Sequence, residues 1–321
     1  MHFLSALKNL RRNKPDRGEV DLLLSTSTAV IQLAIPAQPE VAGAFGVARA
    51  VDEGQGLYYG IARDPHDHIW VGARCSMVSD AQPSEAERGR LLRLTHPSDA
   101  TRFKCPVSPR PIRDLHDLAC YNDTLWAVCS YDDAVSIYSF SQDSWAWWQP
   151  LPPTPPQEPD QYHFNSLYFE GDLVWVLAHR RGPSWLLAFP VAAALQGKTV
   201  APVHQIELGQ QSHNIWRQAN GELCTCSSVE GKLVGEHGWQ LRTGGFPRGV
   251  ARLPWGWVVG ISELKERSAR DFSDAQLFFY DDAWQRIAEI TLPKVGMVLD
   301  ILPIPRALTL PCVGQLPVVV N

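Results

Sequence analysis

The stretch Phe246-Pro-Arg-Gly-Val-Ala-Arg252, followed by Trp257-Val-Val-Gly-Ile-Ser262, decides the fold. It predicts a strand that begins at Pro-Arg-Gly, a tight turn at Leu253-Pro-Trp-Gly256, and a second strand that ends at a serine. The same pair of strands recurs at spacings of roughly 35 to 55 residues. The other copies begin at Tyr59, Leu115, Tyr162 and Ser212, and their second strands end at Arg74, Ser130, His179 and Ser228. Strand-rich repeats of this length predict a β-propeller.

The two ends of the chain supply one further unit between them. The segment Val20–Ser27 resembles the second strand of a repeat but has no first strand before it, whereas Gly296–Leu302 resembles a first strand with little after it. Six first strands are expected, near Gly60, His116, Asn165, His213, Arg248 and Val298. We therefore predict an all-β, six-bladed propeller in which N-terminal strands complete the C-terminal blade and so remove an open sheet edge. Five or seven blades remain alternatives, because Ala44–Arg49 faintly resembles another first strand.

We expect three segments: a basic lead-in over residues 1–19, one propeller over residues 20–304, and a C-terminal tail over residues 305–321. Hydrophobic residues make up 45% of the 321 residues, enough for a sizeable core. The net charge of −5 argues against nucleic acid as a partner, and no apolar run is long enough for a transmembrane segment.

The seven cysteines show no disulfide or zinc spacing, so a cytoplasmic location is the expectation. The proline-rich stretch Pro150–Pro159 predicts a stiff surface connector, with a protein partner that binds this loop as the alternative.

Alignment of the repeats places polar side chains at one end of the predicted central channel. Inner strands begin at the channel mouth, and the antiparallel second strands return to it. We expect His116, His163, His213 and Arg248 there as catalytic residues. The predicted substrate-binding residues are Asn165, Arg74, His179, Glu263, Ser262 and Ser130.

Three interpretations of this cluster remain open. His116, His163 and His213 could ligate a divalent transition metal, zinc or iron, with an open coordination position. Alternatively, one histidine carries a proton while Arg248 binds a carboxylate or phosphate of the substrate. In the third interpretation, the polar side chains only solvate a water-filled channel. A calcium site is disfavoured, because Asp117 is the only acid near the cluster and alternation along the strand turns it away.

Four motifs resemble, in order, those of a family of uncharacterised bacterial propeller-like proteins. They are Ser25-Thr-Ser27, His163-Phe-Asn-Ser166, Ser212-His-Asn214, and Phe246-Pro-Arg-Gly-Val-Ala251 with Val259-Gly-Ile-Ser262. The family carries Ser-Thr-Tyr, His-Ile-Asn-Gly, Pro-His-Ser-Pro-Arg, and Arg-Gly-Leu-Ala with Gly-Leu-Ser. The resemblance covers residues 20 to 304 and implies the propeller fold and its ring of His and Arg; it implies no reaction.

We therefore expect a small-molecule ligand in the channel mouth, with an enzyme acting on an anionic or sugar-like substrate as the preferred function. The alternative is a non-catalytic scaffold that binds a protein partner through the propeller rim, since a fold does not define a function.

Overall fold

The computed structural model describes residues 19–37, 45–77, 85–94, 106–155, 158–180, 182–308 and 310–321. The predicted lead-in, apart from Glu19, and residues 156–157 of the proline-rich stretch lie outside the described residues. Within the described part, the backbone is antiparallel β-strand joined by turns, with one short α-helix, α2 (Val191–Leu195).

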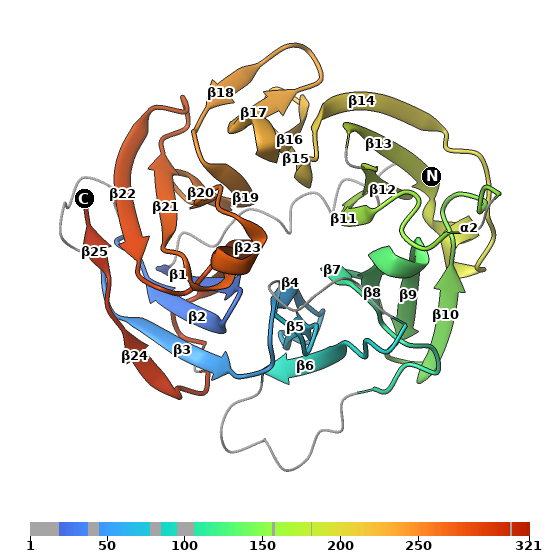
Figure 1. Ribbon diagram of the computed structural model, residues 1–321, viewed down its shortest axis with the longest axis horizontal. Coiled ribbons are helices and arrows are strands. Elements are labelled where there is room, and N and C mark those ends of the chain that lie inside the picture. The colour runs from blue at the N-terminus through green and yellow to red at the C-terminus, as the bar shows by residue number, and fades with distance from the viewer. Residues whose placement is uncertain are drawn as a thin grey trace, which may run out of the picture.

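Six sheets stand around a central axis, as Figure 1 shows. Listed from the centre outward, the first sheet is β4 (Tyr58–Arg63), β5 (Ile69–Ala73), β6 (Arg90–Leu94), and the second is β7 (Leu115–Tyr121), β8 (Thr124–Cys129), β9 (Ala134–Ser139), β10 (Ser144–Trp148). The third sheet is β11 (Phe164–Glu170), β12 (Leu173–Ala178), β13 (Pro183–Pro190), β14 (His204–Gln210), and the fourth is β15 (His213–Arg217), β16 (Leu223–Ser227), β17 (Lys232–Gly235), β18 (Gln240–Arg242). The fifth sheet is β19 (Phe246–Leu253), β20 (Gly256–Ser262), β21 (Ala275–Tyr280), β22 (Arg286–Leu292), β25 (Val319–Val320), and the sixth, which closes the ring, is β23 (Val298–Pro305), β1 (Val20–Thr26), β2 (Ala29–Ala34), β3 (Ala48–Glu53), β24 (Gly314–Leu316).

The chain is a six-bladed β-propeller, as predicted. The six predicted first strands are the innermost strands β4, β7, β11, β15, β19 and β23, and their contacts form a closed ring. The segment near Ala48 that resembled a further inner strand is β3, the fourth strand of the closing sheet, so it adds no seventh blade.

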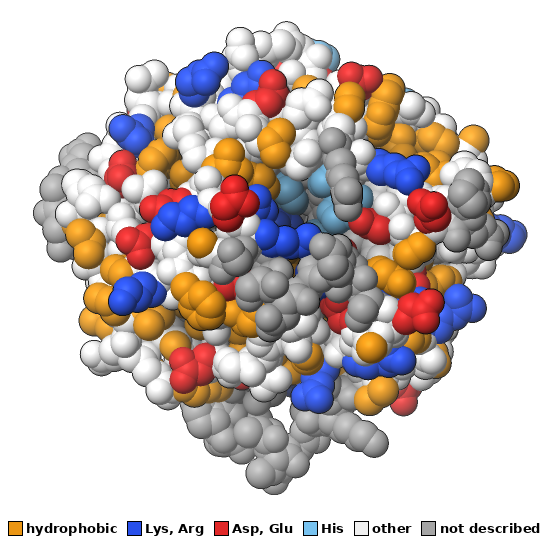
Figure 2. Space-filling model, viewed as in Figure 1, with side chains coloured by type: hydrophobic (Ala, Val, Ile, Leu, Met, Phe, Trp, Pro, Cys, Tyr) orange, Lys and Arg blue, Asp and Glu red, His pale blue; other side chains and the backbone are white. Residues whose placement is uncertain are grey.

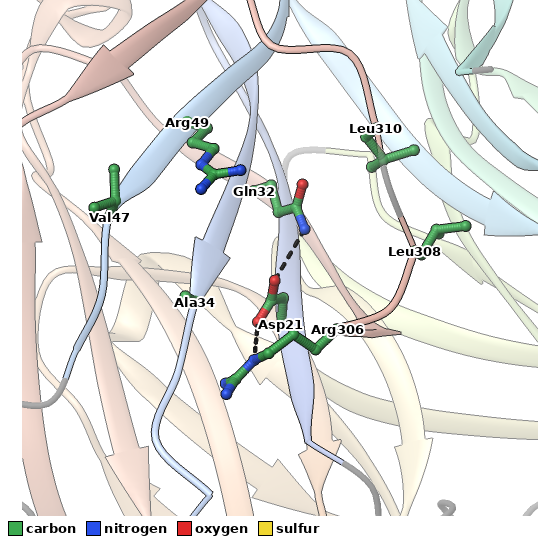
Figure 3. Close-up of a pocket in the computed structure, with 8 residues that line it drawn as sticks. All are labelled: Asp21, Gln32, Ala34, Val47, Arg49, Arg306, Leu308 and Leu310. Carbon is green, nitrogen blue, oxygen red and sulfur yellow. Dashed lines mark hydrogen bonds and ion pairs between the residues drawn. The ribbon is translucent and has the colours of Figure 1, made fainter. Parts of the chain in front are cut away.

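The ring closes where β23 pairs antiparallel with β1, with Val20 opposite Pro305 and Leu24 opposite Ile301. An ion pair also links the two strands at this closure: Arg306 Nε donates to Asp21 Oδ1 at 2.9 Å. Gln32 Nε2 donates to the other oxygen of Asp21, also at 2.9 Å, so that Asp21 lies between two donors in Figure 3. The predicted closure by the N-terminal strands is therefore confirmed.

The C-terminal tail forms two short strands at the periphery of the propeller. Strand β24 pairs with β3 at the edge of the closing sheet, and β25 pairs with β22 of the neighbouring sheet. Residues beyond 304 thus contribute to two blades.

Apolar side chains fill the space between adjacent blades. Leu22 and Ile31 of the closing sheet, for example, pack with Val258 and Leu277 of the neighbouring one. Burial of each such side chain stabilises the fold by about 1.5–3 kcal/mol. These apolar layers leave the polar residues of the inner strands at the central axis.

Every inner strand carries an irregularity in its pairing with the second strand of its blade. The shift falls at Gly60, His116, Asn165, Asn214, the pair Arg248–Gly249, and Leu299. An extra residue of this kind is a β-bulge, which interrupts the alternation of side chains between the two faces of a strand.

The bulges allow side chains of one inner strand to bind the backbone of the next; we call these contacts the hub. Asp300 of β23 accepts a hydrogen bond from Ile61 N, and Asp117 of β7 accepts one from Leu167 N, each at 2.8 Å. Ser166 Oγ accepts from Asn214 N at 2.9 Å, and Asn214 Oδ1 accepts from Gly249 N at 2.6 Å.

Glycine provides the close approach at the two remaining junctions of the hub. A Cβ atom on Gly60 would lie 2.1 Å from Leu118 N, and one on Gly249 would lie 2.9 Å from Ile301 Cγ1. Both glycines have positive φ, 67° and 76°, which a larger residue adopts at a cost. The inner strands are thus joined by side chain-to-backbone bonds at four junctions and by close packing against a glycine at two.

The hub corrects one expectation. Asp117 does not turn away from the axis, because the bulge at His116 cancels the alternation that the prediction assumed. A second acid, Asp300, occupies the matching place on β23.

Candidate functional site

A cavity of about 600 Å³ opens at the channel mouth, above the hub. In Figure 2, pale-blue histidines and blue basic side chains meet in a hollow near the middle of this face. The lining residues are Tyr59, Arg74, Asp114, His116, Glu158, Pro159, Asp160, His163, His179, Arg180, Gln211, His213, Phe246, Arg248, Arg267, Arg270 and Met297. Six of the sequence-predicted residues are therefore together: His116, His163, His213, Arg248, Arg74 and His179.

Four of these residues are histidines that form a continuous row of rings. The ring centroids of His116 and His163 are 4.8 Å apart, and those of His163 and His179 are 4.5 Å apart. His213 follows at 5.6 Å from His179. An aromatic ring closes each end of the row, with Tyr59 at 4.7 Å from His116 and Phe246 at 5.5 Å from His213.

Hydrogen bonds to the wall fix the orientation of two of these rings. His116 Nδ1 lies 2.8 Å from the carbonyl oxygen of Asp114, which can only accept, so Nδ1 carries the proton. His213 Nδ1 lies 2.8 Å from Ser228 Oγ, whose own proton is donated to Pro247 O at 2.8 Å. In both rings, the unprotonated Nε2 is the nitrogen left for the cavity.

His163 is held on a backbone kink by its neighbours. The Asp133 carboxylate accepts hydrogen bonds from the backbone of residues 161–163, including His163 N at 3.1 Å, and His163 has φ +49°. Its Nδ1 lies 2.7 Å from Asp160 Oδ1, forming a histidine–carboxylate dyad. Such a partner holds the ring with Nε2 available as a proton acceptor.

His179 differs from the other three because neither of its ring nitrogens has a hydrogen-bond partner among the described residues. Only 6% of the residue is exposed. A buried polar group without a partner costs about 1–3 kcal/mol, so this ring is available to a ligand.

Three histidines of the row, His116, His179 and His213, are neutral. Burial first, and then His163 and His116, lower the pKa of His179 to about 2. Burial first, and then nearby positive charges that include Arg248, lower the pKa values of His116 and His213 well below their usual range. Each of these rings thus presents one donor and one acceptor and carries no charge.

Arg74 is an internal structural cation of the cavity wall. Its Nε and Nη2 atoms donate to Glu87 at 2.9 Å each, and Nη1 lies 2.8 Å from Asp114 Oδ1. Burial opposes this charge, but Asp114 and Glu87 outweigh it and raise the pKa of Arg74. Because these two acids already pair with the Arg74 guanidinium, Arg74 is not available to bind an anionic ligand.

Arg248 is 5% exposed and has no ion-pair partner within 4.0 Å in the described part of the chain. Its guanidinium lies over the Tyr59 ring, 4.9 Å from the centroid. Below it, burial first raises the pKa of Asp300 to about 6 and the pKa of Asp117 well above its usual range, while Arg248 opposes both changes. The oxygens of those two acids already accept backbone hydrogen bonds.

Four predicted substrate-binding residues are not part of the cavity lining. Ser130 Oγ donates to Phe164 O, and Ser262 Oγ accepts from Val298 N at 3.1 Å; each binds the inner strand of the next blade. Asn165 Nδ2 donates to Ser212 O at 2.8 Å. Glu263 pairs with Lys265 on the outer surface. The recurring serine at the end of the second strand thus joins blades.

The three predicted metal ligands do not converge. Among the described residues, the group of three that brings its ligand atoms within 4.8 Å of one another is Asp114, Asp160 and His163. His116, His163 and His213 come from three blades, and His179 stands between the last two. Arg74 already pairs with Asp114, and Asp160 with His163, so the geometry gives no support to zinc or iron on three imidazoles.

Several lining residues escaped the sequence analysis. Tyr59 and Phe246 lie at the start of their inner strands, as the second and the first residue, and could have been found as aromatic residues in the histidine column. Arg267 and Arg270 belong to the 3-10 helix η4 (Arg267–Phe272), which follows β20. The charged segment Glu263–Asp271 contained the signal, but only the fold shows that its arginines face the cavity.

Comparison with known proteins supports the fold class alone. No protein-family model matches the chain, and no curated protein matches it. A chain in a nidogen/laminin complex aligns with 88% of this chain and 98% of its own, with a TM-score of 0.57 and 11% identity. A protein of unknown function from Bacteroides caccae covers 89% and 99%, with a TM-score of 0.55 and 10% identity. The periplasmic gluconolactonase of Pseudomonas aeruginosa covers 89% and 99%, with a TM-score of 0.51 and 12% identity.

In the part of the chain that the structure describes, no helix has the length and apolar character needed to span a membrane.

Proposed function

We propose that the cavity binds a small anionic, sugar-like substrate and transfers a proton during its conversion. The observation that carries this proposal is His179, a buried imidazole whose two nitrogens have no partner in the described structure. A ligand with hydroxyl groups supplies those partners, because a hydroxyl both donates and accepts. If the cavity held only water, as in the third interpretation, Arg248 would have no anion to balance its charge.

The neutral histidines favour a polyhydroxylated ligand. Nε2 of His116 and Nε2 of His213 are acceptors with fixed orientation, spaced around one wall of the cavity. Sugar hydroxyls are suitable donors to such atoms. A gluconolactonase, at 12% identity, is among the propellers of the same fold, and it is consistent with a sugar-like substrate class.

Arg248 supplies the anion-binding group of this proposal. It is buried, it has no ion pair among the described residues, and its planar guanidinium suits two oxygens of one acid group. His163, oriented by Asp160 at 2.7 Å, is the proton acceptor. General acid–base catalysis of this type contributes about 10²–10⁴-fold to a rate.

The first experiment is calorimetric titration of the protein with gluconate, glucuronate and glucose 6-phosphate. We expect binding of at least one of these probes, and Arg248→Met weakens it at least tenfold. Arg252→Met is the matched control, because Arg252 lies on the same strand but pairs with Asp282 on the outer surface. Wild-type affinity in Arg248→Met, or the absence of binding by all three probes, contradicts the proposal and favours the protein-binding scaffold.

The second experiment tests the chemistry by pH-stat assay of sugar-acid lactones. We expect His163→Ala to lower the rate about 100-fold. His66→Ala is the control, since His66 lies in the turn between β4 and β5 and does not line the cavity. Equal loss in both variants would contradict the role of His163.

A further inference from the structure

The cavity lining has an excess of positively charged side chains. It contains five arginines, Arg74, Arg180, Arg248, Arg267 and Arg270, and three carboxylates, Asp114, Glu158 and Asp160. Asp114 pairs with Arg74, Glu158 lies 3.5 Å from Arg180, and Asp160 binds His163. The remaining three, Arg248, Arg267 and Arg270, have no carboxylate within 4.0 Å among the described residues.

Two of these arginines lie beside the aromatic rings that flank the histidine row. Arg248 stacks over Tyr59 at 4.9 Å, and Arg270 lies 5.9 Å from the centroid of Phe246. Tyr59 and Phe246 are the rings that end the row on its two sides. A ligand in the cavity therefore meets guanidinium groups beside the two rings that flank the row, in addition to the imidazoles of the row itself.

The arginines are close enough to repel one another. Burial first, and then Arg267 and Arg248, lower the pKa of Arg270. Glu266 opposes this effect but makes no ion pair with Arg270. The hub acids Asp117 and Asp300 interact with Arg248, but backbone N–H groups already bind their oxygens. Repulsion among like charges in a partly buried place is relieved when an anion of matching charge binds.

Helix η4 supplies two of the three arginines, and a hydrogen bond orients one of them. Arg270 Nε donates to Lys265 O at 2.8 Å, and the turn after η4 is fixed by Gly296 N, which donates to Ser273 O at 2.8 Å. Gly296 precedes Met297, which itself lines the cavity. Hydrogen bonds thus hold the segment that carries Arg267 and Arg270.

We infer that Arg248, Arg267 and Arg270 form a subsite for a phosphomonoester group. A phosphate ester carries a charge of about −1.5 to −2 at pH 7 and three acceptor oxygens, whereas a carboxylate carries one charge and two oxygens. One guanidinium balances a carboxylate, and this cluster has three. The inference depends on the proposed function: it specifies the anion of the substrate as a phosphate ester and places the hydroxylated part against the histidines.

Calorimetric titration with two matched pairs of ligands tests the inference. The pairs are glucose 6-phosphate with glucuronate, and glycerol 3-phosphate with glycerate; inorganic phosphate is titrated alone. We expect at least one phosphomonoester to bind at least tenfold more tightly than its carboxylate counterpart. Inorganic phosphate should bind more weakly than that ester, because it lacks a body to contact the imidazoles.

Variants of η4 separate this inference from the proposed function. Arg267→Ala combined with Arg270→Ala should remove the preference for the phosphomonoester and leave carboxylate affinity within about twofold of wild type. Lys265→Ala is the control, because Lys265 lies in the same segment but pairs with Glu263 outside the cavity. Thermal melting of each variant confirms that it is folded.

The possible outcomes are distinct. A carboxylate that binds as tightly as its phosphomonoester, or an unchanged preference in the double η4 variant, overturns the phosphate subsite. Inorganic phosphate that binds as tightly as the ester overturns the assignment of an organic ester. If Arg248→Met still weakens binding of the carboxylates in those cases, the proposed function stands without the subsite.

Discussion

The hub and the cavity above it use similar polar residues in opposite ways. In the hub, Asp117, Asp300, Ser166 and Asn214 each accept a backbone hydrogen bond from the next blade. In the cavity, His179 has no hydrogen-bond partner and Arg248 no ion pair among the described residues. Polar residues near a propeller axis therefore do not by themselves indicate a binding site. The unsatisfied ones do, because their missing partner remains to be supplied.

Removal of a hub carboxylate should cause the largest effect on stability. Asp300→Ala leaves the N–H groups of Ile61 and Ile301 without their acceptor. We expect the free energy of unfolding to fall by about 3 kcal/mol, measured by urea denaturation at about pH 4, where Asp300 is protonated in the folded state. Asp282→Ala, an exposed carboxylate on the rim, should change it by less than about 0.5 kcal/mol. Equal effects in the two variants would show that the hub is no more important than the surface.

The same carboxyl makes stability depend on pH in a predictable direction. Asp300 titrates near pH 6 in the folded chain, where burial raises its pKa, and near 3.9 when unfolded. The folded state thus binds this proton more tightly, so the associated stability is complete below pH 4 and is lost as the pH rises through 6. Relative to Asp300→Asn, the wild type should lose about 2 kcal/mol between pH 4 and 7. Parallel stability curves for the two proteins would contradict this.

Substitution of a serine at the end of a second strand tests whether that serine joins two blades or binds a ligand in the cavity. Ser262 was predicted to bind substrate, but its Oγ accepts from Val298 N at the next blade. We expect Ser262→Ala to lower the free energy of unfolding by about 1 kcal/mol. Affinity for the anionic probes should not change. A loss of affinity without a loss of stability would show that Ser262 contributes to ligand binding and not to the contact between blades.

Substitution within the cavity should have the smallest effect on stability. His179→Phe replaces an unpaired polar ring by an apolar ring of similar shape, so the free energy of unfolding should be unchanged or rise by up to about 1 kcal/mol. Binding of the probes should weaken at the same time. Destabilisation beyond about 1 kcal/mol would show that His179 has a structural partner.

Much of this architecture was predictable because it depends on repetition. The paired strands, the serine endings and the incomplete first and last units predicted six blades and their closure. The alignment of inner-strand starts and second-strand ends predicted six of the lining residues. The bulges were not predictable from alternation, which they interrupt. Consequently Asp117 was assigned to the wrong face and Asp300 was missed, although both acids precede a branched apolar residue at matching places on their strands.

The arginines of η4 illustrate a second limit. Their position depends on how the segment after β20 folds back over the axis, which involves contacts such as Gly296 N with Ser273 O. Local sequence carries no signal for such a contact. Charge in a loop indicates function only after the loop has been placed.

The path of the last residues has a mechanical consequence. After β23 has closed the inner ring, the chain crosses to the periphery, where β24 and β25 join the outer edges of two neighbouring sheets. The C-terminal segment therefore makes strand pairings both at the propeller axis, through β23, and at the periphery, through β24 and β25. The closing blade and its neighbour are therefore also tied together at their outer edges, by the pairing of β24 with β3 and of β25 with β22.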